Sequence, residues 1–106
     1  MSFRFMRVLV LFDLPMESLI QRREYSRFRK YLIKSGFLMM QKSVYTKLAL
    51  NATASNAIME AVRENRPTEG LVQMITITEK QYARMEFVIG EGNSIVLDTT
   101  DRVVVL

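Results

Sequence analysis

The chain has 106 residues, of which 49% are hydrophobic and 25% are charged, so it is long enough for one globular domain with a small core. It contains neither cysteine nor histidine, which excludes disulfides, zinc–thiolate sites and every catalytic arrangement that needs an imidazole. The formal net charge is +4 and ten of the fifteen basic residues are arginine, which favours a polyanionic partner, nucleic acid first.

No apolar run approaches the ~20 residues that a membrane-spanning helix requires, and the N-terminal residues do not resemble a secretory signal. We therefore expect a cytoplasmic protein without a membrane partner. Any catalysis has to use carboxylates, a metal ion, tyrosine, lysine or arginine.

The first predicted element is a strand over 5–14, in which an apolar run that starts at Val8 ends at a single acid, Asp13. Successive side chains of a strand point to opposite faces, and here both sets are apolar, so both faces need cover. Sheets often place their chemistry at the carboxyl ends of buried strands, which makes Asp13 a candidate catalytic residue. The alternative is that Asp13 only caps the turn that contains Pro15.

A helix is predicted over 19–35, with Ser18 as its N-cap and Gly36 after its last turn. One side of this helix is apolar, and the other carries basic residues with Glu24 as the only acid. A solvated face normally mixes both signs of charge, so this pattern favours contacts with phosphates over a plain solvent face. The candidate nucleic-acid-binding residues are Arg22, Arg23, Arg27, Lys30, Lys34 and, beyond the helix, Lys42.

Residues 37–50 predict two strands with a tight turn or bulge near 41–43. A second helix follows and ends near 66–67. Its start has three candidate N-caps: Asn51, Thr53 and Ser55.

The last third of the chain predicts mainly β-structure. A turn over 68–70 leads into a strand over 71–78, then a helical turn over 79–85 and another short strand over 86–89. The chain ends in a free apolar strand, which needs an edge on which to dock. The candidate docking residues are Val103, Val104, Val105 and Leu106.

The order β-α-β-β-α-β with a β-rich tail predicts an α+β, ferredoxin-like sandwich with extra C-terminal strands. We expect a single domain, with 1–85 as the ferredoxin-like part and 86–106 as a strand or tail for docking. Both helices of such a fold cover one face of the sheet, so the other apolar face predicts a two-fold homodimer packed sheet to sheet. Two Asp13 carboxylates across the dimer axis could then share one Mg²⁺ ion and activate water against a phosphodiester.

These elements resemble the small CRISPR-associated endoribonuclease family. The resemblance lies in the strand Val-Leu-Val-Leu-Phe-Asp at 8–13, the arginine-rich helix, Gly-Phe at 36–37 and Gln-Lys-Ser-Val-Tyr at 41–45. Four further strings, at 12–15, 37–41, 48–51 and 76–82, resemble the branch found in type II CRISPR systems. The resemblance spans nearly the whole chain.

The resemblance implies a homodimer in which Asp13 is the catalytic, Mg²⁺-binding carboxylate at the end of the first strand. It implies metal-dependent cleavage of RNA or DNA in some members. It also implies a scaffold role, in which the dimer bridges two dimers of a larger CRISPR integrase subunit and holds duplex DNA during spacer acquisition. The terminal apolar strand would then dock on that larger subunit.

Two departures from the family pattern weaken the nuclease hypothesis. Many nuclease members have tyrosine where this chain has Phe12, and a basic residue where it has Met39. We therefore rank the scaffold first and keep an endonuclease acting on single-stranded RNA or double-stranded DNA as the alternative, so whether the chain is an enzyme stays open. An RRM-type RNA-binding module is disfavoured, because the strands carry valine and leucine instead of exposed aromatic residues.

Overall fold

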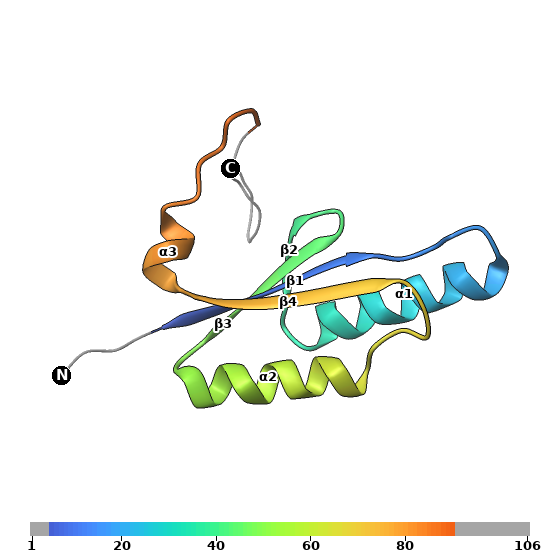
Figure 1. The fold of residues 1–106 in the computed structure, drawn as a ribbon, viewed down its shortest axis with the longest axis horizontal. Helices are drawn as coiled ribbons and strands as arrows, with labels where there is room; N and C mark the ends of the chain where they lie inside the picture. The colour runs from blue at the N-terminus through green and yellow to red at the C-terminus, as the bar shows by residue number, and fades with distance from the viewer. Residues whose placement is uncertain (1–4, 91–106) are drawn as a thin grey trace.

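A computed structural model of the chain describes residues 5–90. The strands are β1 (Met6–Asp13), β2 (Leu38–Gln41), β3 (Val44–Ala49) and β4 (Leu71–Thr78), and the helices are α1 (Leu19–Lys34), α2 (Ala52–Glu64) and α3 (Glu79–Ala83). The strands form one antiparallel sheet in the order β2-β3-β1-β4, with α1 and α2 on one side of it (Figure 1). The predicted α+β, ferredoxin-like arrangement is confirmed.

Both ends of α1 follow local rules that the sequence makes visible. The Ser18 hydroxyl accepts a hydrogen bond from the Gln21 amide at 3.1 Å, and the Gln21 side chain accepts one from the Ser18 amide at 2.9 Å. At the other end Gly36 has φ +96°, and the Phe37 amide donates to the Leu32 carbonyl at 3.0 Å. The predicted start and end of this helix are therefore confirmed.

Of the three candidate N-caps of α2, the structure selects one. Asn51 is the N-cap, because its Oδ1 accepts a hydrogen bond from the Ala54 amide at 2.8 Å. Ser55 instead lies inside the helix, where it is buried and donates to the Ala52 carbonyl at 2.8 Å. None of the helices within residues 5–90 is both long and apolar enough to cross a bilayer.

The predicted strand over 86–89 is wrong. After α3 the described residues continue without strand structure, and Phe87, Val88 and Ile89 are exposed. Apolar composition suggested a strand, but a strand needs a neighbour, and α3 directs the chain away from the β4 edge (Figure 1). The predicted docking strand at 103–106 lies outside the described residues.

The core lies between the sheet and the two long helices. Val8, Val10 and Phe12 of β1 are at most 5% exposed. The Phe12 ring lies 5.3 Å from the Phe28 ring and 5.6 Å from the Tyr45 ring, measured between centroids. Burying one such side chain stabilises the fold by about 1.5–3 kcal/mol. Because Phe12 points to the helices, the next residue along the strand lies on the opposite face.

That opposite face of the sheet carries exposed apolar side chains, as predicted. Leu48, Leu71 and Ile75 are about half exposed there. The homodimer that would cover this face stays a prediction.

Candidate acidic site and nucleic-acid interface

Asp13 lies at one end of the sheet, between two other segments. It is the last residue of β1, and its backbone pairs with Leu71 at the start of β4. On the other side the Phe12 amide donates to the Ser43 carbonyl at 3.0 Å, which places the turn at Lys42 and Ser43 beside it. The turn that contains Ser43, one of the residues that carry the family resemblance, therefore lies beside the predicted acid.

The Asp13 side chain has no structural partner in the described part of the chain. It is exposed, and no hydrogen bond or ion pair within residues 5–90 engages its carboxylate. The alternative that this carboxylate caps the following turn therefore finds no support among these residues. Within the described part of the chain the Asp13 carboxylate is therefore available to bind a ligand.

A magnesium site at Asp13 is a prediction that one chain alone does not complete. Among the described residues no group of three acidic side chains could hold a metal ion. Mg²⁺ usually takes one or two carboxylates and completes its shell with water and phosphate oxygens. Asp13 fits such an ion as one of those carboxylates, and a second, where the ion takes two, would come from elsewhere, for example from a second copy of the chain.

The two departures from the family pattern lie away from Asp13. Phe12 is directed to the helices, on the other face of the strand. Met39 of β2 pairs with Tyr45 of β3, and Tyr45 pairs with Val10 of β1. Met39 therefore lies level with Val10, three residues before Asp13 along β1. Neither departure bears directly on the surroundings of the Asp13 carboxylate.

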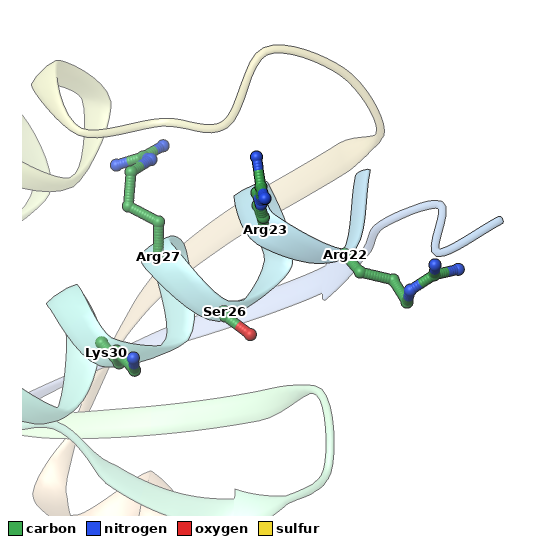
Figure 2. Close-up of a pocket in the computed structure, with 5 residues that line it drawn as sticks. All are labelled: Arg22, Arg23, Ser26, Arg27 and Lys30. Atoms are coloured by element: carbon green, nitrogen blue, oxygen red, sulfur yellow. The ribbon is translucent and has the colours of Figure 1, made fainter. Parts of the chain in front are cut away.

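Four of the predicted basic residues come together on α1. A shallow open depression of about 460 Å³ is lined by Arg22, Arg23, Ser26, Arg27 and Lys30, which fan out from successive turns of the helix (Figure 2). We call this surface the α1 depression. Ser26 was not predicted, because one serine carries no charge signal, although its i, i+4 spacing to Arg22 and Lys30 places it in the same row. Lys34 and Lys42 are exposed but do not line the depression.

Two arginines of the α1 depression already have structural partners. Arg22 Nη1 donates to the carbonyls of Met16 and Glu17, at 3.2 and 2.9 Å, and so holds the loop before the helix. Arg27 forms an ion pair with Glu24, at 3.0 Å between Nε and Oε2. Both guanidinium groups therefore form hydrogen bonds within the protein, which a ligand would have to share or replace.

The other predicted cations are free within residues 5–90. No hydrogen bond or ion pair there engages the charged groups of Arg23, Lys30, Lys34 or Lys42. The candidate nucleic-acid interface therefore has Arg23 and Lys30 as its available charges within the α1 depression. Lys34 extends the Lys30 row by one turn.

Glu24 links α1 to the connection between α2 and β4. Its Oε1 accepts a hydrogen bond from the Thr68 amide at 3.2 Å, and its carboxylate accepts two from Arg27. The hydrogen bonds from Arg27, and more weakly the one from Thr68, lower the pKa of Glu24. Sequence analysis identified Glu24 only as a lone acid.

Gly70 packs closely against residues 13–15, the end of β1 and the start of the loop after it. Its φ is +103°, and a Cβ there would lie 2.7 Å from Leu14 Cδ2, 3.0 Å from the Asp13 carbonyl oxygen and 3.1 Å from Pro15 Cδ. Only glycine fits both the backbone conformation and the space. The predicted turn over 68–70 thus also packs against the candidate site.

Asp13 and the α1 depression do not form one pocket. Asp13 belongs to the sheet face opposite Phe12, which the helices leave open, whereas the depression lies on α1. The connection over 65–70 contacts both regions, through Arg27 and Glu24 at its start and through Gly70 at its end.

Comparisons with known proteins give matches that cover most of the chain. A family described as CRISPR associated protein Cas2 matches residues 6–85. A Treponema denticola protein named CRISPR-associated endoribonuclease Cas2 is 56% identical over 101 residues, which cover 95% of this chain and 100% of that protein. Proteins with the same name from Streptococcus mutans serotype c (strain UA159) and Ligilactobacillus salivarius are 41% and 38% identical over 95% of this chain, and the matches cover 93% and 100% of those proteins.

Proposed function

The chain belongs to the Cas2 family of CRISPR-associated proteins, and on that premise we propose that it is a metal-dependent endoribonuclease in which Asp13 is the metal-binding carboxylate. The name of the relatives supplies the reaction class. The observation that supports Asp13 is its exposed carboxylate at the end of a central strand, without a partner among residues 5–90.

The proposal includes a homodimer. One Asp13 would hold Mg²⁺ from one side and the same residue of the second copy from the other, with the open sheet faces packed together. When bound, such an ion supplies positive charge that activates water and offsets charge on the phosphodiester. The exposed Lys42, on the turn beside Asp13, adds positive charge where the substrate backbone would lie.

The test is the substitution Asp13→Asn, which keeps the shape of the side chain and removes its charge. Cleavage of single-stranded RNA in the presence of Mg²⁺ should fall at least about 100-fold, because the metal contributes several kcal/mol to catalysis of this kind. Chelating the metal from the wild-type protein should cause the same loss.

The matched control is Glu17→Gln, an exposed acid in the loop after β1, which should cleave at the wild-type rate. Equal cleavage by the Asp13→Asn and wild-type proteins would remove Asp13 from the mechanism.

A second candidate function is the scaffold role in spacer acquisition. The α1 depression favours it, because Arg23 and Lys30 are exposed and free within the described residues. A helix face that gathers several cations suits the backbone of duplex DNA, which binding proteins contact through phosphates. In this role the dimer would bind duplex DNA and a larger CRISPR integrase subunit. The two functions do not exclude each other.

The scaffold function predicts a change in salt dependence. Replacing both Arg23 and Lys30 with glutamine should lower the slope of log K for duplex DNA against log salt by about two, since each lost phosphate contact removes about 0.9. A control with the same charge change replaces Arg63 and Lys80, which are exposed on α2 and α3. An unchanged slope in the Arg23/Lys30 variant would exclude the α1 depression as the DNA-binding surface.

A further inference from the structure

The connection between α2 and β4 is tied to α1 at its beginning. Arg27 Nη2 donates to the carbonyls of Asn65 and Arg66, at 3.2 and 3.1 Å, while Glu24 Oε1 accepts from the Thr68 amide at 3.2 Å. Arg27 and Glu24 are joined to each other by two hydrogen bonds of 3.0 and 3.2 Å. One ion pair on the helix therefore offers both donors and an acceptor to the backbone of the same loop.

The same connection packs against the acid at its other end. Gly70 lies so close to Asp13 and Leu14 that no Cβ fits between them, and Leu71 is the backbone partner of Asp13 in the sheet. Thr68, which Glu24 holds, is only two residues from Gly70. A residue spans at most ~3.6 Å of chain, so little slack separates the two contacts.

We propose that Glu24 and Arg27 are positioning residues for Asp13. They hold the 65–70 connection against residues 13–15 and thereby keep the Asp13 carboxylate in the orientation that binds metal. This inference rests on the proposed nuclease function, because it concerns the same acid. It also assigns Arg27 a task other than contact with nucleic acid.

A second pair in the molecule provides the matched control. Glu60 and Arg63 on α2 have the same residue types at the same i, i+3 spacing, with 3.0 Å between Oε1 and Nη2. Neither of these side chains contacts the 65–70 connection through a hydrogen bond within the described residues. If substitutions in the two pairs have equal effects, the effect comes from the stability of the helices. If only the substitution in the α1 pair has an effect, the effect comes from its hydrogen bonds to the 65–70 connection.

The first experiment compares Glu24→Gln with Glu60→Gln in the full chain. Amide hydrogen exchange at residues 13–14 and 70–71 should become about fivefold faster in Glu24→Gln, because a neutral amide oxygen holds Arg27 and the Thr68 amide more weakly than the carboxylate does, and stay unchanged in Glu60→Gln. The Mg²⁺ concentration for half-maximal RNA cleavage should rise roughly 10-fold only in Glu24→Gln, with RNA affinity unchanged. Faster exchange confined to residues 65–68 would overturn the inference.

The second experiment exchanges the two charges. The double variant Glu24→Arg with Arg27→Glu re-forms an ion pair on α1, but its new residue 24 cannot accept from the Thr68 amide and its new residue 27 cannot donate to the carbonyls. We expect this variant to stay defective in exchange and in Mg²⁺ dependence, whereas Arg27→Lys, which retains a donor, recovers part of both. Wild-type behaviour of the double variant would overturn the inference.

The two proposals can fail separately. If Asp13→Asn cleaves RNA as the wild type does, the proposed role of Asp13 in cleavage is wrong, while the exchange rates at residues 13–14 still decide whether the α1 pair holds that segment. If Asp13 is essential and Glu24→Gln changes neither exchange nor Mg²⁺ dependence, the function stands and the positioning role is wrong.

Discussion

Two helices of this protein carry the same ion pair with different consequences. Glu24 and Arg27 on α1 and Glu60 and Arg63 on α2 both follow Glu-x-x-Arg spacing, and both pairs form hydrogen bonds of about 3 Å. The α2 pair is 60% and 52% exposed, and its side chains form no hydrogen bond outside the pair within residues 5–90. The α1 pair is 24% and 42% exposed and also binds three backbone groups of another segment.

The difference shows that the neighbours of an ion pair determine what the pair does. An exposed pair on a single helix contributes about 0.3–0.5 kcal/mol, and salt screens it. A pair that also satisfies backbone groups of a loop fixes the geometry of that loop. Here the loop leads to the candidate catalytic acid, so the α1 pair can affect function without touching a substrate.

The largest expected effect comes from Gly70→Ala, which pushes the loop away from the acid at the end opposite to the α1 pair. The substitution places a Cβ 2.7 Å from Leu14 Cδ2 and requires φ near +103° of a non-glycine residue, so we expect a loss of about 1–3 kcal/mol in the free energy of unfolding. Thermal unfolding measures this loss.

Gly90→Ala is the control for Gly70→Ala. Gly90 also has a positive φ, of +97°, but has no heavy atom within 4 Å of the added Cβ. It isolates the backbone cost from the crowding at residues 13–15. Equal losses in the two variants would mean that the 65–70 connection moves away from residues 13–15 without a cost in free energy. The α1 pair could then not act on Asp13 through this connection, and the distinction between the two ion pairs would fail.

An intermediate effect is expected from Arg27→Gln compared with Arg63→Gln. Arg27 loses hydrogen bonds to two backbone carbonyls in addition to its ion pair, which should cost about 1 kcal/mol, while Arg63 should cost less than about 0.5 kcal/mol. Urea unfolding of both variants measures the difference. Identical midpoints would show that the carbonyl contacts of Arg27 add nothing to stability.

The smallest expected effect is on the pH dependence of stability. The pKa of Glu24 is lowered from the ordinary value of 4.5, mainly by the hydrogen bonds from Arg27. A lowered folded-state pKa stabilises the fold fully above the ordinary value, and this contribution is lost as the pH falls through the lowered value. Unfolding midpoints measured from neutral pH to well below 4.5 should therefore fall less steeply in Glu24→Gln than in the wild type. Parallel curves would contradict the effect of Arg27 on Glu24.

Much of the fold could be predicted because its boundaries depend on local chemistry. Ser18 and Gly36 mark the ends of α1 through caps that require only neighbouring residues, and the predicted strand over 71–78 coincides with β4. The apolar run of β1 was predicted to reach Asp13, where the strand ends, whereas the face on which Asp13 lies follows only from the packing of Phe12 against Phe28 of α1.

The remaining features depend on contacts between distant parts of the chain. Glu24 reaches the Thr68 amide across 44 positions of sequence, and Gly70 touches the end of β1, so neither role is visible in a local pattern. The incorrect strand over 86–89 has the same cause. Its residues have strand-forming composition, but α3 leaves them without a neighbouring strand among residues 5–90.

The central place of β1 in the sheet has a consequence for biosynthesis. β1 is made first, yet one of its two neighbours is β4, with Met6 paired to Thr78 across almost the entire described chain. Until β4 has emerged from the ribosome, one edge of this apolar strand has no partner, and such edges recruit strands of other molecules. We therefore expect nascent chains that end before Leu71 to depend on chaperones, and folding to wait for the completion of β4.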